Sequence, residues 1–230
     1  MGTTIGYVGI GTNEEYYNNK FNLFVQLSPV VELGNTKSMF LKYFCKQGFS
    51  IFDDNTSRGF HEFFGKNWYG PYGKEVKSYL KPLRILKKSM IPSKDHDDPV
   101  SSKIFENHFP HGASIKTIVH LGTMVNAGKG DGKNLSFFDW HDEKLNMELY
   151  GSKTPPIIDI FGPEKIPMVI FAGVGDKIVN IEDVRRVKEG FKGNLKHYQE
   201  LEGDHLSFFI GKDMTYVDDM ITQIKKELKL

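Results

Sequence analysis

The sequence predicts an α/β fold in which late parallel strands with flanking helices are combined with a helical lid insertion. Short apolar runs at residues 21–28 and 167–172 are rich in β-forming side chains, which is typical of buried parallel strands. Between these runs the strand alternation is lost and aromatic residues become frequent. We therefore expect core segments at residues 1–31 and 165–230 and a lid or cap insertion at residues 32–164.

The first core segment begins with small residues, Met1-Gly-Thr-Thr-Ile-Gly6, which suit a helix that packs closely on a sheet. We expect this helix to end near Asn18 and Asn19. The strand at residues 21–28 follows it and is closed by Pro29. Without a second neighbouring strand, the apolar edge of this strand would be a template for pairing with other chains.

The insertion is marked by many aromatic side chains. Two interpretations are open. The rings form the insertion's own core, or some of them face a pocket for an acyl chain, because apolar pockets with few polar groups suit such ligands. The residues concerned are Phe40, Tyr43, Phe44, Phe49, Phe52, Phe60, Phe63, Phe64, Trp68, Tyr69 and Tyr72.

The second core segment resumes an alternation of strands and helices. After the strand at 167–172 we expect a helix at 183–191, a strand at 196–201 and a final helix from about residue 214 to 228. Apolar residues at helical spacing give each helix one side that packs on the sheet. They are Val184, Val187 and Phe191 in the first helix, and Val217, Met220, Ile221, Ile224 and Leu228 in the second.

The composition is that of an ordinary globular protein: 39% of the 230 residues are hydrophobic and 26% are charged. A formal net charge of +1 disfavours nucleic acid as a partner. The single cysteine, Cys45, excludes an internal disulfide and is expected to be a buried, inert thiol. The apolar runs are too short to span a bilayer, and the N-terminus lacks a signal-peptide pattern. Glycosylation sequons occur at Asn55 and Asn134.

Two residues have the context of acid–base catalysis. Asp176 and His205 each lie in a loop after a predicted strand, at the end of an open α/β sheet where active sites are found. A histidine can take a proton from a hydroxyl nucleophile and return it to the leaving group, and a buried carboxylate can fix the tautomer of that histidine. Asp204 is a rival for the carboxylate role, but adjacent side chains diverge, so we expect Asp204 to be solvated.

The other histidines do not predict a metal site. His108 and His111 lie close in sequence, and His120 and His141 follow, but their spacing matches no common ligand motif. Pro110 interrupts any helix that would align the first pair. We expect no metal.

Several motifs together resemble the C-terminal part of the acid lipases, the gastric and lysosomal type with its steryl ester hydrolase relatives. The resemblance extends over nearly the whole chain. It rests on Gly2-Thr-Thr-Ile-Gly6, Leu27-Ser-Pro-Val30, His108-Phe-Pro-His-Gly-Ala-Ser114, His120, Phe137-Phe-Asp139, Pro155-Pro156, Gly173-Val-Gly-Asp176 and Asp204-His-Leu-Ser-Phe208.

The resemblance implies an α/β-hydrolase fold and a Ser-Asp-His triad, with Asp176 as the acid and His205 as the base. It also implies that the backbone N–H of Met1 is an oxyanion donor. No Gly-x-Ser-x-Gly motif occurs in the sequence, so the chain starts, on this interpretation, one residue after the nucleophile and is inactive alone. The departures from the family are Ser207, where relatives often have Asp, and Met1, where they usually have Gln.

The implied substrates are triacylglycerols or steryl esters, cleaved through an acyl-serine intermediate. The resemblance implies no metal or organic cofactor, suggests a secreted or lysosomal location, and allows a transient contact with a lipid surface. Two alternatives stay open. One is a non-catalytic module that binds lipid or another partner, and the other is a different α/β-hydrolase, such as a thioesterase or a haloalkane dehalogenase.

Overall fold

The structure is a computed structural model that describes residues 1–59, 61–63, 95–108, 112–126, 135–191 and 193–230. Its central sheet has parallel strands in the order β1-β4-β5. The strands are β1 (Phe24–Leu27), β4 (Met168–Gly173) and β5 (Leu195–Leu201). The α/β class predicted from the sequence is confirmed, and each strand end lies within three residues of its predicted position.

The central strand β4 is buried along its whole length, which explains why it is a continuous apolar run rather than an alternating one. Met168, Ile170 and Ala172 belong to one apolar cluster, whereas Val169 and Phe171 belong to a second cluster. Because successive side chains of a strand point to opposite faces, the two clusters cover the two faces of the sheet.

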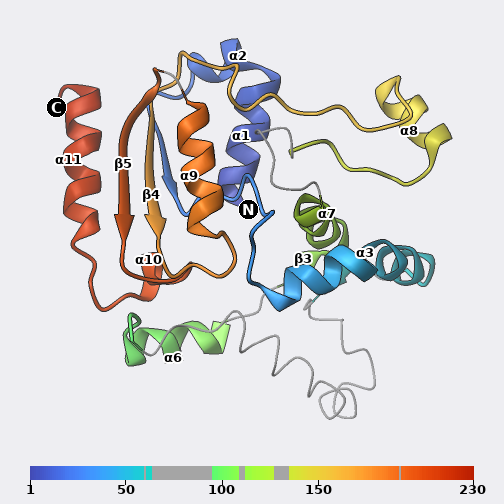
Figure 1. The fold of residues 1–230 in the computed structure, drawn as a ribbon, viewed down its shortest axis with the longest axis horizontal. Coiled ribbons are helices and arrows are strands. Elements are labelled where there is room, and N and C mark those ends of the chain that lie inside the picture. The colour runs from blue at the N-terminus through green and yellow to red at the C-terminus, as the bar shows by residue number, and fades with distance from the viewer. Residues whose placement is uncertain (60, 64–94, 109–111, 127–134, 192) are drawn as a thin grey trace.

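Helices cover both faces of the sheet (Figure 1). The first cluster contains Tyr7 and Ile10 of α1 (Gly2–Thr12) together with Val184 and Val187 of α9 (Ile181–Gly190). The second contains Phe208 of α10 (Ser207–Ile210) and Tyr216 of α11 (Tyr216–Leu228). This three-layer arrangement is the one that a parallel sheet requires.

Two predicted helices differ in detail. The opening helix is broken at Asn13, whose side chain accepts a hydrogen bond from Tyr16 N (3.1 Å) and caps a separate helix, α2 (Glu14–Asn18). In the last helix, Val217 and Met220 pack against the sheet as predicted, but Ile221 is 41% exposed. The apolar stripe of α11 is therefore narrower than its sequence indicates.

Small residues in α1 allow the close packing that the sequence predicts. A Cβ atom at Gly6 would lie 2.4 Å from the ring of Phe24 in β1, and one at Gly9 would lie 2.6 Å from the ring of Tyr17 in α2. A side chain at either position would therefore require the neighbouring ring to move. The ring of Tyr7 lies between them in sequence and packs edge-on against Phe24.

The segment between β1 and β4 is mainly helical where it is described. It contains α3 (Met39–Ser57), α6 (Pro99–His108), α7 (Ile115–Asn126) and α8 (Glu143–Tyr150), and a two-stranded antiparallel ribbon of β2 (Glu62–Phe63) and β3 (Ala113–Ser114). Helices α3 and α7 lie side by side and away from the central sheet (Figure 1). A Cβ atom at Gly122 would lie 2.9 Å from the Phe44 backbone, so this glycine permits their close approach.

The described aromatic residues of the insertion include both core and surface positions. Phe40 and Phe44 are buried, Phe52 packs against the same cluster, and Tyr43 is 55% exposed. Phe60, Phe64, Trp68, Tyr69 and Tyr72 lie outside the described residues. The apolar cluster that contains Phe40 and Phe44 also contains residues of α1, β4 and α9, so the insertion and the sheet share one continuous core. The boundaries at residues 32 and 164, and a lid function, stay predictions.

Candidate active site

Asp176 and His205 come together at one edge of the sheet. Asp176 follows β4 and His205 follows β5, and these neighbouring parallel strands end on the same side. The distance between His205 Nδ1 and Asp176 Oδ2 is 2.7 Å, within the range of a charge-assisted hydrogen bond. The two residues thus form a dyad, although they are 29 positions apart in the sequence.

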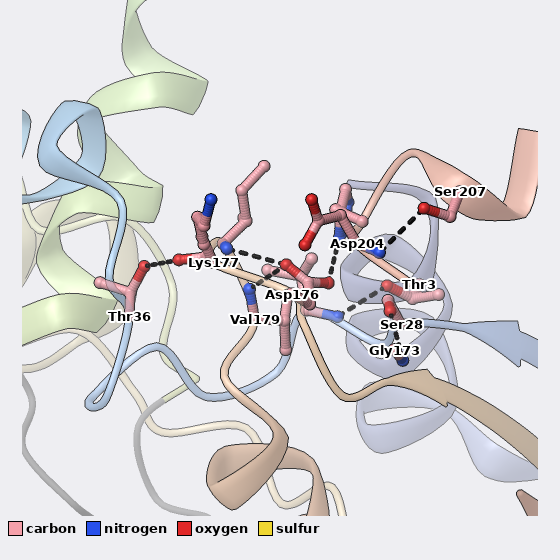
Figure 2. A network of polar contacts seen from close by, with 12 residues as sticks. Thr3, Ser28, Thr36, Gly173, Asp176, Lys177, Val179, Asp204 and Ser207 are labelled. Atoms are coloured by element: carbon pink, nitrogen blue, oxygen red, sulfur yellow. Dashed lines mark hydrogen bonds and ion pairs between the residues drawn. The ribbon is translucent and has the colours of Figure 1, made fainter. Parts of the chain in front are cut away.

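The Asp176 carboxylate is rigidly held. Its side chain is 0% exposed, and its second oxygen, Oδ1, accepts hydrogen bonds from Ile178 N (2.8 Å) and Val179 N (2.9 Å). Figure 2 shows this carboxylate enclosed by the loop that carries Lys177 and Val179. Both oxygens have donors, as a buried carboxylate requires. The loop itself therefore aims Oδ2 at the imidazole.

His205 is accessible from one side, because its side chain is 26% exposed. An ionised carboxylate can only accept hydrogen bonds, so Asp176 selects the tautomer of neutral His205 in which Nδ1 carries the proton. The other ring nitrogen, Nε2, is then an acceptor with an unshared electron pair. The dyad is consequently able to take a proton at Nε2 and to stabilise the resulting imidazolium.

Glycine residues bring the two loops close enough for this contact. Gly175 N donates a hydrogen bond to Gly203 O (2.9 Å). A Cβ atom at Gly175 would lie 2.8 Å from Asp204 Oδ1 and 3.0 Å from Gly203 O. Gly203 has φ +144°, a backbone conformation that favours glycine, and its own Cβ would lie 2.8 Å from Ser207 Cβ. Glycine at positions 175 and 203 therefore allows the loops that carry Asp176 and His205 to approach each other closely.

Asp204 is not the partner of His205. Its pKa is raised by burial and by the nearby carboxylates of Asp97 and Asp176, while Lys177 acts in the opposite direction. The expectation that Asp204 is solvated holds only in part, because the residue is half-buried, with Oδ1 close to Gly175. The expectation that its side chain diverges from that of His205 agrees with the structure, in which Asp176 makes the hydrogen bond.

The start of α1 lies at the same end of the sheet. Thr3 Oγ1 accepts a hydrogen bond from Val30 N (3.0 Å), and Thr4 Oγ1 donates one to Val30 O (2.7 Å). Ser28, directly after β1, accepts a hydrogen bond from Gly173 N (3.4 Å) at the end of β4 (Figure 2). Met1 is the N-cap of α1 and is 50% exposed. Its assignment as an oxyanion donor stays a prediction.

The other described histidines and Cys45 belong to no metal-binding group within the described ranges. His120 Nε2 lies 2.9 Å from Ser136 O, and the pKa of His120 is lowered by burial. The ring of His141 packs at a tilted angle against the ring of Phe49. Cys45 is half-buried rather than buried, and burial raises the pKa of its thiol. The described ranges contain no group of three or more His, Cys, Asp or Glu residues that could hold a metal ion.

Residues 109–111, which include His111 and Pro110, lie outside the described part of the chain. His108 is the last residue of α6 and is exposed. No helix in the described part of the chain has the length and apolar character needed to cross a membrane.

A pocket of about 290 Å³ lies beside the His205 loop. Gly203, Asp204, Ser207 and Tyr216 contribute to its walls, but neither Asp176 nor His205 does. The two members of the dyad are therefore not among the residues that line this pocket.

Known proteins with similar sequences are acid lipases. The chain is 25% identical to mouse lipase member N over 225 residues, which cover 93% of this chain and 52% of that protein. It is 26% identical to rat gastric triacylglycerol lipase over 225 residues (93% and 53%), and 22% identical to the golden hamster tear acid lipase-like protein over 227 residues (97% and 55%). No protein-family model matches.

The resemblance to the acid lipases is confirmed by these alignments, which extend over nearly all of the chain. At the same time, the chain spans about half the length of the curated relatives that it matches.

Proposed function

We propose that this chain supplies the acid–base half of a carboxylic ester hydrolase, with Asp176 as the acid and His205 as the base of a Ser-Asp-His triad. The observation that carries the proposal is the 2.7 Å contact between His205 Nδ1 and a fully buried Asp176 carboxylate. The similarity to gastric triacylglycerol lipase supports the hydrolase class. The strand-end position of both residues is where α/β enzymes have their sites.

In the proposed reaction, His205 Nε2 takes the proton of a serine hydroxyl while the serine oxygen attacks the ester carbonyl carbon. The tetrahedral intermediate collapses, the bond to the alcohol oxygen breaks, and Nε2–H protonates that oxygen. A water molecule then repeats the sequence on the acyl-serine and releases the acid. Asp176 stabilises the imidazolium in both halves of the cycle without itself taking the proton.

In this proposal the nucleophilic serine would lie upstream of Met1, since the sequence contains no Gly-x-Ser-x-Gly motif. The N-terminal turn of α1, fixed beside the end of β1 by Thr3 and Thr4, would follow the serine directly. In a longer polypeptide the nitrogen of Met1 would become a peptide N–H, and this group would be one of the oxyanion donors.

Covalent labelling of a longer polypeptide that includes the upstream sequence tests the proposal. We expect a fluorophosphonate to modify one upstream serine and to abolish hydrolysis of a short-chain chromogenic ester in parallel. Peptide mass spectrometry locates the modified serine, and His205→Ala should prevent its modification because the hydroxyl is then no longer activated. Ester hydrolysis that survives complete labelling, or labelling that is independent of His205, would contradict the assigned roles.

The proposed substrates are neutral lipid esters, triacylglycerols or steryl esters, presented at a lipid surface. The proposal of a lipid surface is based on exposed apolar side chains beside the His205 loop. Val100 and Ile104 of α6 are 67% and 58% exposed, and Phe209 of α10, which is next to α6, is 69% exposed. A folded protein gains no stability from such exposed side chains, whereas they can bind an apolar surface.

We expect the double substitution Val100→Ser/Ile104→Ser to lower the activity of the longer polypeptide on emulsified long-chain esters by about a hundredfold or more, since two apolar side chains buried at a lipid surface would contribute about 1.5–3 kcal/mol each. Hydrolysis of a soluble short-chain ester should be unchanged. The ratio of the two rates is the measurement. Met147→Ser/Leu149→Ser on α8 is the matched control, because these side chains are similarly exposed, at 46% and 52%. Equal loss in both pairs would contradict a specific lipid-binding surface on α6.

A further inference from the structure

A short segment of the insertion pairs with the chain directly after the His205 loop. Asp98 N donates a hydrogen bond to Ile210 O (2.7 Å), and Lys212 N donates one to His96 O (2.8 Å). Asp97 and Gly211 form an antiparallel bridge between these two bonds. Residues 95–98 lead into α6, so this pairing attaches the start of α6 to the end of α10 (Figure 1).

The side chain of Asp97 reaches into the His205 loop. Asp97 is 2% exposed, and its Oδ1 accepts a hydrogen bond from Ser207 Oγ at 2.6 Å. Ser207 Oγ in turn accepts a hydrogen bond from Asp204 N at 2.9 Å, a contact that Figure 2 shows. A chain of two hydrogen bonds therefore runs from the insertion to the backbone of the residue next to His205.

Hydrophobic packing alone does not account for a carboxylate at position 97. The second oxygen, Oδ2, is buried, and the described residues offer it no hydrogen-bond partner. A buried polar atom without a partner costs free energy, about 1–3 kcal/mol in protein mutational data. An apolar residue at position 97 would avoid this cost but could not accept the Ser207 hydroxyl proton. The Asp97 carboxylate therefore contributes a fixed acceptor for Ser207, and this acceptor defines the geometry of the His205 loop.

The Ser207 hydroxyl can connect Asp97 to the backbone of the His205 loop. A hydroxyl group has one proton to donate and can also accept, so donation to Asp97 leaves an oxygen lone pair aimed at Asp204 N. The same loop is fixed at its other end by Gly175 N, which donates to Gly203 O (2.9 Å). The two attachments bracket His205 and set the position of its ring relative to Asp176.

We propose that Asp97 is a positioning residue that acts through Ser207 to hold the His205 loop, and that it couples the insertion to the catalytic dyad. The inference deepens the proposed function and rests on it for its catalytic meaning. It assigns to the segment before α6 a part in selecting the Nδ1–H tautomer of His205. If the Asp97 acceptor is lost, Asp204 N loses its fixed partner and the ring of His205 is free to turn away from Asp176.

The test uses the chain as it exists and reads the tautomer of His205 from the ring nitrogen shifts of histidine-labelled protein by NMR, assigned with His205→Ala. In the unsubstituted chain we expect the Nδ1–H tautomer to dominate. Asp97→Ala and Ser207→Ala should each lower the ratio of Nδ1–H to Nε2–H tautomers by about tenfold, the factor of one hydrogen bond to a charged group. Asp97→Asn should retain most of the ratio, because an amide oxygen still accepts from Ser207.

An exchanged pair distinguishes positioning from general stability. Asp97→Ser/Ser207→Asp keeps one hydroxyl donor and one carboxylate, and an aspartate at 207 could accept from both Asp204 N and the serine at 97. Ser207→Asp alone would place two carboxylates opposite each other, and we expect it to lower the ratio of Nδ1–H to Nε2–H tautomers. The exchanged pair should restore this ratio to that of the unsubstituted chain. Asp213→Ala is the matched control, since Asp213 caps Thr215 in the same region and has no part in the relay.

A tautomer ratio in folded Asp97→Ala equal to that of the unsubstituted chain would overturn the proposal, as would a mixed tautomer in the unsubstituted chain. If Asp97→Ala does not fold by circular dichroism, failure of the exchanged pair to restore the ratio overturns it instead. A longer polypeptide that shows no hydrolysis while the tautomer still responds to Asp97 would contradict the ester hydrolase function and leave the positioning role intact.

Discussion

Asp176→Asn is expected to reduce the turnover of the longer polypeptide about 10⁴-fold, and His205→Ala about 10⁶-fold, with little change in the fold. The amide of an asparagine at 176 would have to offer either its oxygen or its NH₂ group to the imidazole. Because Ile178 N and Val179 N already require an acceptor at Oδ1, the NH₂ group would face His205 and favour the wrong tautomer. His205→Ala removes the base itself.

The measurement is the kcat for a soluble short-chain ester together with the urea midpoint of each variant. Asp204→Asn is the matched control, because it changes a carboxylate next to His205 that does not accept from Nδ1. We expect its turnover to stay within about tenfold of the unsubstituted protein. If Asp204→Asn were as damaging as Asp176→Asn is expected to be, while Asp176→Asn were nearly normal, the acid would be Asp204.

The sequence predicted the dyad because each of its members has a local signature. Asp176 and His205 both follow a buried strand, and parallel strands that are neighbours end at the same edge. The continuous apolar run of β4 was equally informative, since a strand covered on both faces does not alternate. Such short-range sequence patterns can be recognised without knowledge of the rest of the fold.

Other features depend on contacts that no local pattern contains. The bond between Ser207 and Asp97 joins positions 110 residues apart, and nothing near Asp97 marks it as a partner of the His205 loop. Helix α10 has four residues, too few for an apolar period to be visible. The break at Asn13 was missed because small residues before it and tyrosines after it both suit a helix, and only the cap to Tyr16 N decides the boundary.

The partial burial of Asp204 could not be predicted from the sequence either. Asp204 was expected in solvent because adjacent side chains diverge, yet the close approach of Gly175 brings the two loops together and half-covers its carboxylate. The sequence shows these glycines, but their packing against each other could not be deduced from spacing. The consequence is that the dyad lies in a group of carboxylates, Asp97, Asp176 and Asp204, that interact electrostatically.

The chain alone, without upstream sequence, is expected to show no esterase activity on a short-chain chromogenic ester and no labelling by a fluorophosphonate. On the proposed assignment, the dyad can accept a proton at Nε2 but its serine nucleophile lies outside the chain, and loss of a triad nucleophile reduces turnover by about 10⁶-fold. Ser28 and Ser207, which lie near the dyad loops, are both engaged in hydrogen bonds, to Gly173 N and within the Asp97 relay.

The assay compares the purified chain with its His205→Ala variant, so that a contaminating esterase, which would be equally present in both, is recognised by equal rates. A non-catalytic module that binds lipid would give the same inactive result but would retain binding to vesicles of neutral lipid in phospholipid, and this binding should be insensitive to His205→Ala. Hydrolysis by the purified chain that disappears in His205→Ala would mean that a serine within residues 1–230 is the nucleophile. The upstream location proposed for that residue would then be wrong, whereas the roles of Asp176 and His205 would stand.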